Sequence, residues 1–271
     1  MIACSGTHRG RIRKNNEDAI YADKENHLFI VADGMGGHLA GEEASRMAIQ
    51  SISGLLKKVR SNYTTIIRKA ICTANNLIYS KAESDPKFKG MGTTLTLTLA
   101  RDRELYVGHV GDSRLYRLRE GKLELLTEDH SKVWELYKEG IISREEARNH
   151  PYKNVITRAV GIKPDTITDV QKLEMQADDL YLLCSDGLTD MLSDNAIKDI
   201  ITNTRFSQEQ KLNHLISSAN QKGGKDNISV ILWTIEATDF AAQTASAMKK
   251  TKLRVLYHKQ VHFTIRSPVR H

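Results

Sequence analysis

The sequence predicts an α+β fold, a four-layer α-β-β-α sandwich in which two antiparallel sheets pack together between outer helices. Residues 94–99 alternate between threonine and leucine, which is the two-residue period of a strand with one apolar face. Strand-like segments follow one another across short turns, and parallel strands would need long crossovers instead. Pairs of helical patterns bracket the strand blocks. Each sheet is therefore expected to bury one face on the other sheet and one beneath helices.

The first half of the chain is predicted to contain strands, then a pair of helices, then more strands. The strands are expected at residues 2–9, 20–31, 94–99, 105–110 and 113–118, where β-branched, aromatic or alternating residues are frequent. Helical spacing of apolar residues begins after Gly41 and extends to Val59, and a second helical stripe covers residues 63–81.

The second half is predicted to repeat this arrangement after a surface insertion, the flap, at about residues 128–165. Strands are expected at about 168–175, 179–184 and 228–235, and helices at about 194–203 and 207–221. Within the flap, residues 131–140 and 143–149 are expected to be helical. The second flap helix is favoured because Ser143 and Glu146 have the spacing of a capping box.

The positive charge of the chain is concentrated at its C-terminus. The chain has 271 residues and a net charge of +7, and residues 241–271 contain seven of its 40 basic residues and no acidic residue. The remainder is neutral, with 33 residues of each sign. We expect one domain over residues 1–240 and a basic tail over 241–271. Because the domain has no net positive charge that would attract nucleic acid, no nucleic-acid partner is expected.

The basic tail has two interpretations. A basic segment can dock on acidic lipid, nucleic acid or an acidic partner, or it can be a solvated or packed end of the chain. Six apolar residues make it more apolar than a disordered arm: Val255, Leu256, Tyr257, Val261, Phe263 and Ile265. We therefore favour packing, or docking on an acidic partner or surface.

No targeting or membrane segment is expected. No apolar run approaches the ~20 residues that span a bilayer, and the N-terminus lacks the basic flank and apolar region of a secretory signal. Cys4, Cys72 and Cys184 are far apart and form no Cys-x-x-Cys pair, so neither disulfides nor a zinc knuckle is expected. The cysteines suit a reducing compartment, and the cytoplasm is predicted.

Acidic residues recur at glycine-rich ends of predicted strands. They are Asp33, Asp112, Asp186 and Asp226, with Glu17 and Asp18 further upstream. Each of them alone is more often a turn or loop residue, because Asp-Gly is a common turn pair. Gathered together, such carboxylates would repel one another, and divalent cations would remove that cost. Two bridged cations activate a water molecule, and a phosphate ester is the natural substrate of such a centre.

These motifs, taken in order, resemble the metal-dependent serine/threonine protein phosphatases, the protein phosphatase 2C family. The matching segments are residues 13–18, 32–38, 92–94, 110–114, 185–187 and 224–227. The likeness extends from about residue 3 to 235. It is greatest to the bacterial branch because Met35 lies in the Asp-Gly-x-Gly-Gly element, and because the flap contains Asp129-His130-Ser131 and residues 154–158.

The resemblance implies a cofactor and a set of roles. The cofactor is Mn²⁺ or Mg²⁺, as two ions and a third, weaker one. Asp33 is the catalytic bridging carboxylate, and Arg13 is the catalytic and substrate-binding arginine that grips the phosphate. The other metal positions are the Glu17 side chain and Gly34 carbonyl at the second ion, Asp18 through its waters, Asp186 and Asp226 at the first ion, and Asp112 at the third. A hydroxide bridging the ions would attack the phosphate in line.

One departure from the family pattern concerns the leaving group. Eukaryotic relatives carry a histidine where this chain has Met35, and that histidine is thought to protonate the leaving group. A metal-bound water or His38 could take over this role, and we hypothesise water. The flap charges are open to two interpretations, a solvated face or a surface that selects protein substrates.

The predicted function is hydrolysis of phosphoserine and phosphothreonine in proteins, opposing a serine/threonine kinase that is itself among the expected substrates. The alternative is an inactive phosphatase-like module with a binding or regulatory role. Inactive members usually lack a metal carboxylate or the arginine, and this chain retains all of them. The enzyme is therefore favoured.

Overall fold

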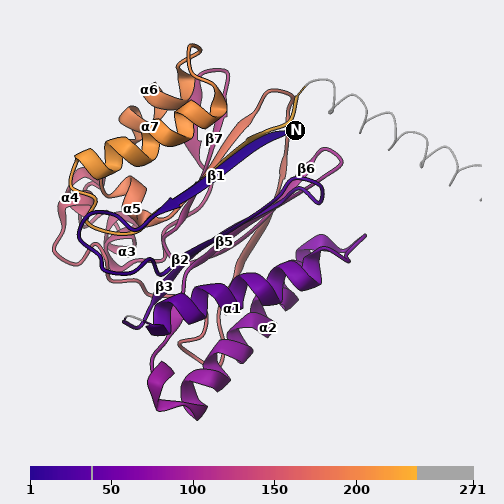
Figure 1. Ribbon diagram of the computed structural model, residues 1–271, viewed down its shortest axis with the longest axis vertical. Helices are drawn as coiled ribbons and strands as arrows, with labels where there is room; N and C mark the ends of the chain where they lie inside the picture. Colours follow the sequence, from indigo (N-terminus) through magenta and orange to yellow (C-terminus); the bar gives the residue numbers. More distant parts are fainter. Residues whose placement is uncertain (38, 237–271) are drawn as a thin grey trace, which may run out of the picture.

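The computed structural model describes residues 1–37 and 39–236. It confirms the predicted sandwich: two antiparallel sheets lie face to face, with α1 and α2 outside one sheet and α6 and α7 outside the other (Figure 1). Among these residues, no helix has the length and apolar character needed to cross a membrane. His38 and the tail at 241–271 lie outside the described residues, so the alternative proton donor and the basic tail are not seen.

The first sheet contains both the first and the last strand of the described chain, which pair with each other. Its strand order is β1-β11-β10-β7-β8, with every pair antiparallel. The strands are β1 (Ile2–His8), β7 (Arg114–Arg119), β8 (Lys122–Leu125), β10 (Leu180–Cys184) and β11 (Ile228–Thr234). β11 alternates between faces, as a strand buried on both sides must. Its Val230 and Leu232 pack under the outer helices, whereas Ile231 and Trp233 face the other sheet.

The second sheet has the strand order β2-β3-β5-β6-β9, and the short strand β4 pairs with the end of β3. The strands are β2 (Asp18–Asp23), β3 (Leu28–Met35), β4 (Gly92–Thr93), β5 (Leu95–Arg101), β6 (Glu104–Val110) and β9 (Asp169–Glu174). Between the sheets, the Trp233 ring stacks on Phe29 at 5.2 Å and on Tyr181 at 4.3 Å between ring centroids. These rings join the sheets at the centre of the sandwich.

The helices cover the outer faces of the sheets. α1 (Leu39–Leu56) and α2 (Tyr63–Ser84) share one apolar cluster with the second sheet. α5 (Asp186–Thr189), α6 (Asp194–Thr202) and α7 (Gln208–Gln221) share another with the first sheet. The single turn η1 (Pro86–Phe88) follows α2. Three apolar layers between four structural layers are what the periodicity predicts.

Two local predictions are wrong. Residues 20–31 are not one strand, because the polar residues after Asp23 form a turn between β2 and β3. Asp23 Oδ1 accepts a hydrogen bond from Asn26 N at 2.9 Å, and His27 has a positive φ of 46°. The first helix is also shorter than predicted. The helical spacing of apolar residues extends to Val59, but α1 ends at Leu56 and Val59 is a buried loop residue. β4 and β8 were not predicted, since each is only two to four residues long.

The flap lies between β8 and β9 and contains α3 (Lys132–Lys138) and α4 (Arg144–Asn149). The capping box of α4 is present: Glu146 N donates to Ser143 Oγ and Ser143 N donates to the Glu146 carboxylate. Arg144 Nη2 donates to Asp194 Oδ2 at 2.7 Å, and Lys153 forms an ion pair with Asp190. These two ion pairs connect the flap to the α5–α6 region.

Candidate metal centre

The sequence-predicted acidic residues come from the ends of strands in both sheets. Asp18 and Asp33 are directly paired across β2 and β3 of the second sheet. Asp186 begins α5, separated from the end of β10 by one residue, and Asp226 lies in the loop just before β11; both of these strands belong to the first sheet. Asp112 lies in the turn between β6 and β7, where the chain passes from one sheet to the other. The site therefore spans the sandwich.

The electrostatics of Asp33 show that these carboxylates share one region. Burial raises the pKa of Asp33 well above its usual range, and the charges of Asp18, Asp186, Asp112 and Asp226 raise it further. Burial also raises the pKa of Asp186 well above its usual range, and the charges of Asp112 and Asp226 raise it further. Burial raises the pKa of Asp18 to about 6. Burial, followed by the charge of Asp129, raises the pKa of Asp112 to about 7. Each buried carboxylate makes the ionisation of the others more costly.

The donor set fits a hard divalent cation. Asp18 Oδ1 and Asp186 Oδ1 are buried and have no hydrogen-bond partner in the part of the chain that the structure describes. Unpartnered buried carboxylate oxygens are expensive, and they are the atoms that Mg²⁺ or Mn²⁺ would bind. Within residues 1–37 and 39–236, however, no three His, Cys, Asp or Glu side chains are gathered closely enough to hold an ion. The carboxylates thus interact electrostatically without forming a compact cluster.

Glu17 and Gly34 lie side by side, as the predicted second-ion ligands should. Gly34 N donates to Glu17 O at 3.2 Å, and Ser45 Oγ of α1 donates to the same carbonyl at 2.7 Å. A Cβ on Gly34 would lie 2.1 Å from Gly41 O, and one on Gly41 would lie 2.1 Å from Glu17 Oε2. Glycine is therefore required at both positions for α1 to approach β3 and the Glu17 carboxylate.

Arg13 lies at the edge of this site. Its side chain is 50% exposed, and its Nη2 donates to Asp226 Oδ2 at 2.6 Å. Burial lowers the pKa of Arg13, but the carboxylates of Asp226, Glu17 and Asp33 outweigh burial and raise it. The predicted phosphate-binding arginine and a predicted metal ligand are thus joined directly by an ion pair.

Three polar residues support the site, and sequence reasoning assigned them no role. Asn227 Oδ1 accepts from Glu17 N at 2.7 Å, while its Nδ2 donates to Arg9 O and Asn15 O. Ser185 Oγ donates to Asp18 Oδ2 at 2.8 Å. Thr94 Oγ1 accepts from Asp33 N at 3.0 Å. Each lies in a segment that matches the family pattern, 92–94, 185–187 or 224–227, and this was the only available signal.

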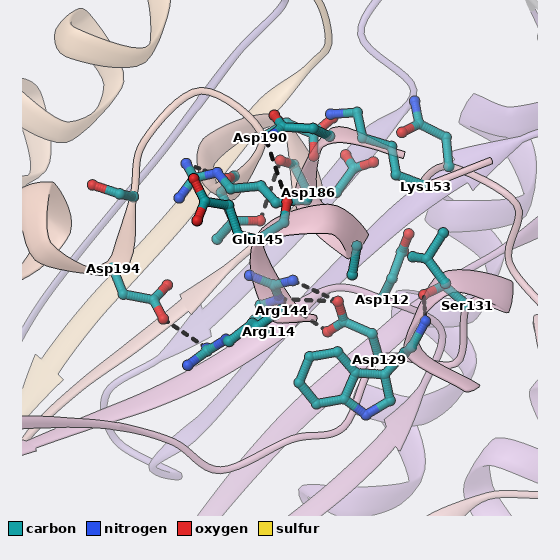
Figure 2. A pocket seen from close by; sticks show the side chains of 18 of the residues that line it. Asp112, Arg114, Asp129, Ser131, Arg144, Glu145, Lys153, Asp186, Asp190 and Asp194 are labelled. Atoms are coloured by element: carbon teal, nitrogen blue, oxygen red, sulfur yellow. Dashed lines mark hydrogen bonds and ion pairs between the residues drawn. The ribbon is translucent and has the colours of Figure 1, made fainter. Parts of the chain in front are cut away.

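A cavity of about 580 Å³ opens from Asp112 and Asp186 towards the flap. Figure 2 shows Arg144 and Lys153 of the flap on its walls, with Asp190 and Asp194 from the α5–α6 region. The cavity places protein charges of both signs beside the acidic site.

Most of the chain is similar to known proteins. A family model described as protein phosphatase 2C matches residues 5–232. The serine/threonine phosphatase stp of Listeria welshimeri is 43% identical over 234 residues, which are 83% of this chain and 92% of that protein. A crystal structure of Mycobacterium tuberculosis PstP has a TM-score of 0.82 and 37% identity, and the match covers 87% of this chain and 98% of that one. A PstP catalytic domain in complex with two manganese ions has a TM-score of 0.79 and 35% identity, with coverage of 87% and 98%.

The fold, the acidic site and these relatives together define a metal-dependent hydrolase of phosphoric monoesters, a protein-serine/threonine phosphatase. The chain belongs to the protein phosphatase 2C family, as the order of its motifs predicts.

Proposed function

We propose that this enzyme hydrolyses phosphoserine and phosphothreonine in proteins at a binuclear manganese or magnesium centre, and that it opposes a serine/threonine kinase. The observation that carries the proposal is the set of carboxylates whose charges act on buried Asp33, with Arg13 paired to one of them, Asp226. The two manganese ions in the PstP catalytic domain support the choice of metal.

Each residue of the site has a proposed role. Asp33 would bridge two cations, with Asp186 and Asp226 at the first and Glu17 and the Gly34 carbonyl at the second. When bound, the cations supply a water whose pKa is lowered towards neutrality. Asp18 would orient ordered water through its unpartnered oxygen, and Asp112 would contribute to a third, weaker ion.

Arg13 is proposed to bind two oxygens of the substrate phosphate through its planar fork. A phosphate there would compete with Asp226 for the guanidinium, and a cation would compete with Arg13 for the Asp226 carboxylate. A cation at Asp226 and a phosphate at Arg13 therefore favour the same rearrangement.

The leaving-group proton is proposed to come from water, because the thioether of Met35 carries no exchangeable proton. A His38→Ala variant that slows an ester with a poor leaving group, but spares p-nitrophenyl phosphate, would contradict this.

The proposed limits of the phosphatase domain are residues 1–240, with the flap at 128–165 and a basic tail at 241–271 that docks on an acidic partner or surface. Deletion of the tail without loss of activity, solubility or partner binding would dismiss any strong role for it.

The proposed compartment is the cytoplasm, which suits free thiols at Cys4, Cys72 and Cys184. Residence of the native protein outside the cytoplasm after cell fractionation would disprove this.

Initial rates on p-nitrophenyl phosphate and on a phosphothreonine peptide, with Mn²⁺ or with chelator, test the function. Asp33→Asn is expected to lower kcat at least ~100-fold, and Arg13→Ala is expected to do so by ~100-fold, chiefly on the peptide. Arg11→Ala is the control, because Arg11 is an exposed arginine in the same loop. Turnover that persists in chelator would reject the metal mechanism. Phosphopeptide binding without turnover would favour the inactive module.

A further inference from the structure

The turn that carries Asp112 is held by one histidine at the root of the flap. Gly111 has a φ of 110°, and a Cβ there would lie 2.6 Å from Thr94 Cβ, so only glycine fits. Gly111 N donates to His130 Nδ1 at 3.1 Å, and His130 N donates to Gly111 O at 2.8 Å. Both backbone polar groups of Gly111 are therefore bonded to a single residue.

These contacts fix the protonation of the ring. A backbone N–H can only donate, so His130 Nδ1 must be unprotonated and the ring proton must lie on Nε2. His130 Nε2 then donates to Asp169 Oδ2 at 3.0 Å. Arg158 Nη1 lies 3.2 Å from the same nitrogen and donates to the other oxygen of Asp169 at 3.3 Å. Burial lowers the pKa of His130, which favours the neutral ring.

The ring has little freedom to move. His130 is 6% exposed, and its ring packs against that of His109 with 4.8 Å between centroids. His109 is in turn held by Thr96 Oγ1 and by Glu128 O, each at 2.9 Å. Asp169 belongs to β9, at the edge of the second sheet. The histidine therefore ties the Gly111 turn to a rigid strand.

We propose that His130 is a positioning residue for Asp112: its neutral ring holds the Gly111–Asp112 turn so that the Asp112 carboxylate stays within electrostatic reach of Asp33 and Asp186. The inference rests on the proposed function, in which Asp112 contributes to metal binding. Residues that orient ligands in this way typically change metal affinity or activity by about 10–100-fold when they are replaced.

Two near-isosteric variants separate the two sides of the ring. His130→Asn places an amide oxygen where Nδ1 lies and can still accept from Gly111 N, but it loses Asp169. His130→Gln reaches Asp169 with an amide nitrogen where Nε2 lies, but it leaves Gly111 N without its acceptor. Both variants lose the imidazole, so the loss of ring packing is common to them.

The measurements are the Mn²⁺ concentration for half-maximal p-nitrophenyl phosphate hydrolysis, and the weakest Mn²⁺-binding step in titration calorimetry. His130→Gln is expected to raise both values about 10-fold with an unchanged KM, whereas His130→Asn stays within about twofold of wild type. The reverse order, or equal values for the two variants, would overturn the proposal.

Asp169→Ala provides a second test at a half-exposed position, where folding is not at stake. It removes the acceptor that keeps the proton on Nε2, so it is expected to raise the same Mn²⁺ requirement by a smaller factor. No shift would also overturn the proposal. A wild-type protein without Mn²⁺-dependent turnover would instead mean that the proposed function fails.

Discussion

Gly41 and Gly54 lie on the same helix, α1, yet their surroundings differ. A Cβ at Gly41 would lie 2.1 Å from Glu17 Oε2, 2.8 Å from Gly34 C and 2.9 Å from Met35 N. A Cβ at Gly54 would meet nothing within 4 Å. The Glu17 carboxylate can rotate away, but the backbone of β3 cannot. Alanine at Gly41 must therefore displace a proposed ligand of the second ion.

We expect Gly41→Ala to raise the Mn²⁺ concentration for half-maximal activity by about 10-fold or more, as displaced ligand supports do. Gly54→Ala should leave activity unchanged and stabilise the protein by about 0.5–1 kcal/mol, because alanine is the better helix former. Activity titrations and thermal melts of the two variants measure both effects. Equal activity in the two variants would contradict the role of Gly41.

The order of the motifs along the chain predicts which residues are candidates for the site, but it does not predict their contacts. Arg13 and Asp226 are 213 positions apart, and no local pattern states that they form an ion pair. His130 and Gly111 stood in two separate motifs, and their mutual hydrogen bonds depend on the turn geometry of Gly111. A sequence motif identifies the chemistry of a side chain, whereas only the fold determines its neighbours.

At the scale of the element, the helical part of the flap is joined to the α5–α6 region by two ion pairs. Arg144 and Lys153 hold it to Asp194 and Asp190, and the Arg144 side chain is 54% exposed. Ion pairs with such exposure contribute only about 0–1 kcal/mol each, because solvent screens them. We therefore propose that α3 and α4 can shift against the α5–α6 region when a protein substrate binds, while the flap root stays bonded to Gly111 and Thr93.

We expect Arg144→Ala with Lys153→Ala to leave p-nitrophenyl phosphate hydrolysis within about twofold, since neither pair holds a proposed metal ligand. The same double variant should change kcat/KM on a phosphoprotein several-fold, because both side chains line the cavity beside Asp112. Lys138→Ala is the control, an exposed flap lysine paired with Glu128. An unchanged preference among phosphoproteins would leave the flap as a solvated face.

Long periodic elements could be predicted, and so could the short helix α4 through its capping box, whereas short elements without such a signal could not. α2 and β5 have enough residues to show a period, and both were predicted. The β2–β3 hairpin was missed because β-branched residues on both sides of its polar turn suggested one continuous strand. β4 consists of Gly92 and Thr93 alone, and its pairing with β3 depends on tertiary packing.

At the scale of the whole molecule, the site opposes folding. Carboxylates from both sheets are buried together, and burial with their mutual repulsion raises the pKa values of Asp33 and Asp186. Without a cation, the native state must hold these groups either protonated or unfavourably charged. The carboxylates of the proposed site therefore lower the stability of the native state when no metal is bound.

We expect Asp33→Asn to be more stable than wild type in chelator while it loses activity, because it removes the central charge and keeps the side-chain shape. A gain of ~1 kcal/mol would raise Tm by about 2–4 °C in a chain of this size. Mn²⁺ at 100 times its Kd should stabilise wild type by about 2.7 kcal/mol and the variant by less. Thermal melts with Mn²⁺ and with chelator give these values, and a less stable variant in chelator would contradict the repulsion argument.

The chain contains two tryptophans, and they occupy opposite environments. Trp233 is fully buried in the aromatic stack between the sheets, while Trp134 lines the flap cavity. Intrinsic fluorescence therefore has one source that reports on packing between the two sheets and another that reports on occupancy of the cavity beside the proposed metal ligands Asp112 and Asp186. With Trp134→Phe as the reference, tryptophan fluorescence of the unlabelled protein would distinguish unfolding of the core around Trp233 from changes at the cavity that Trp134 lines.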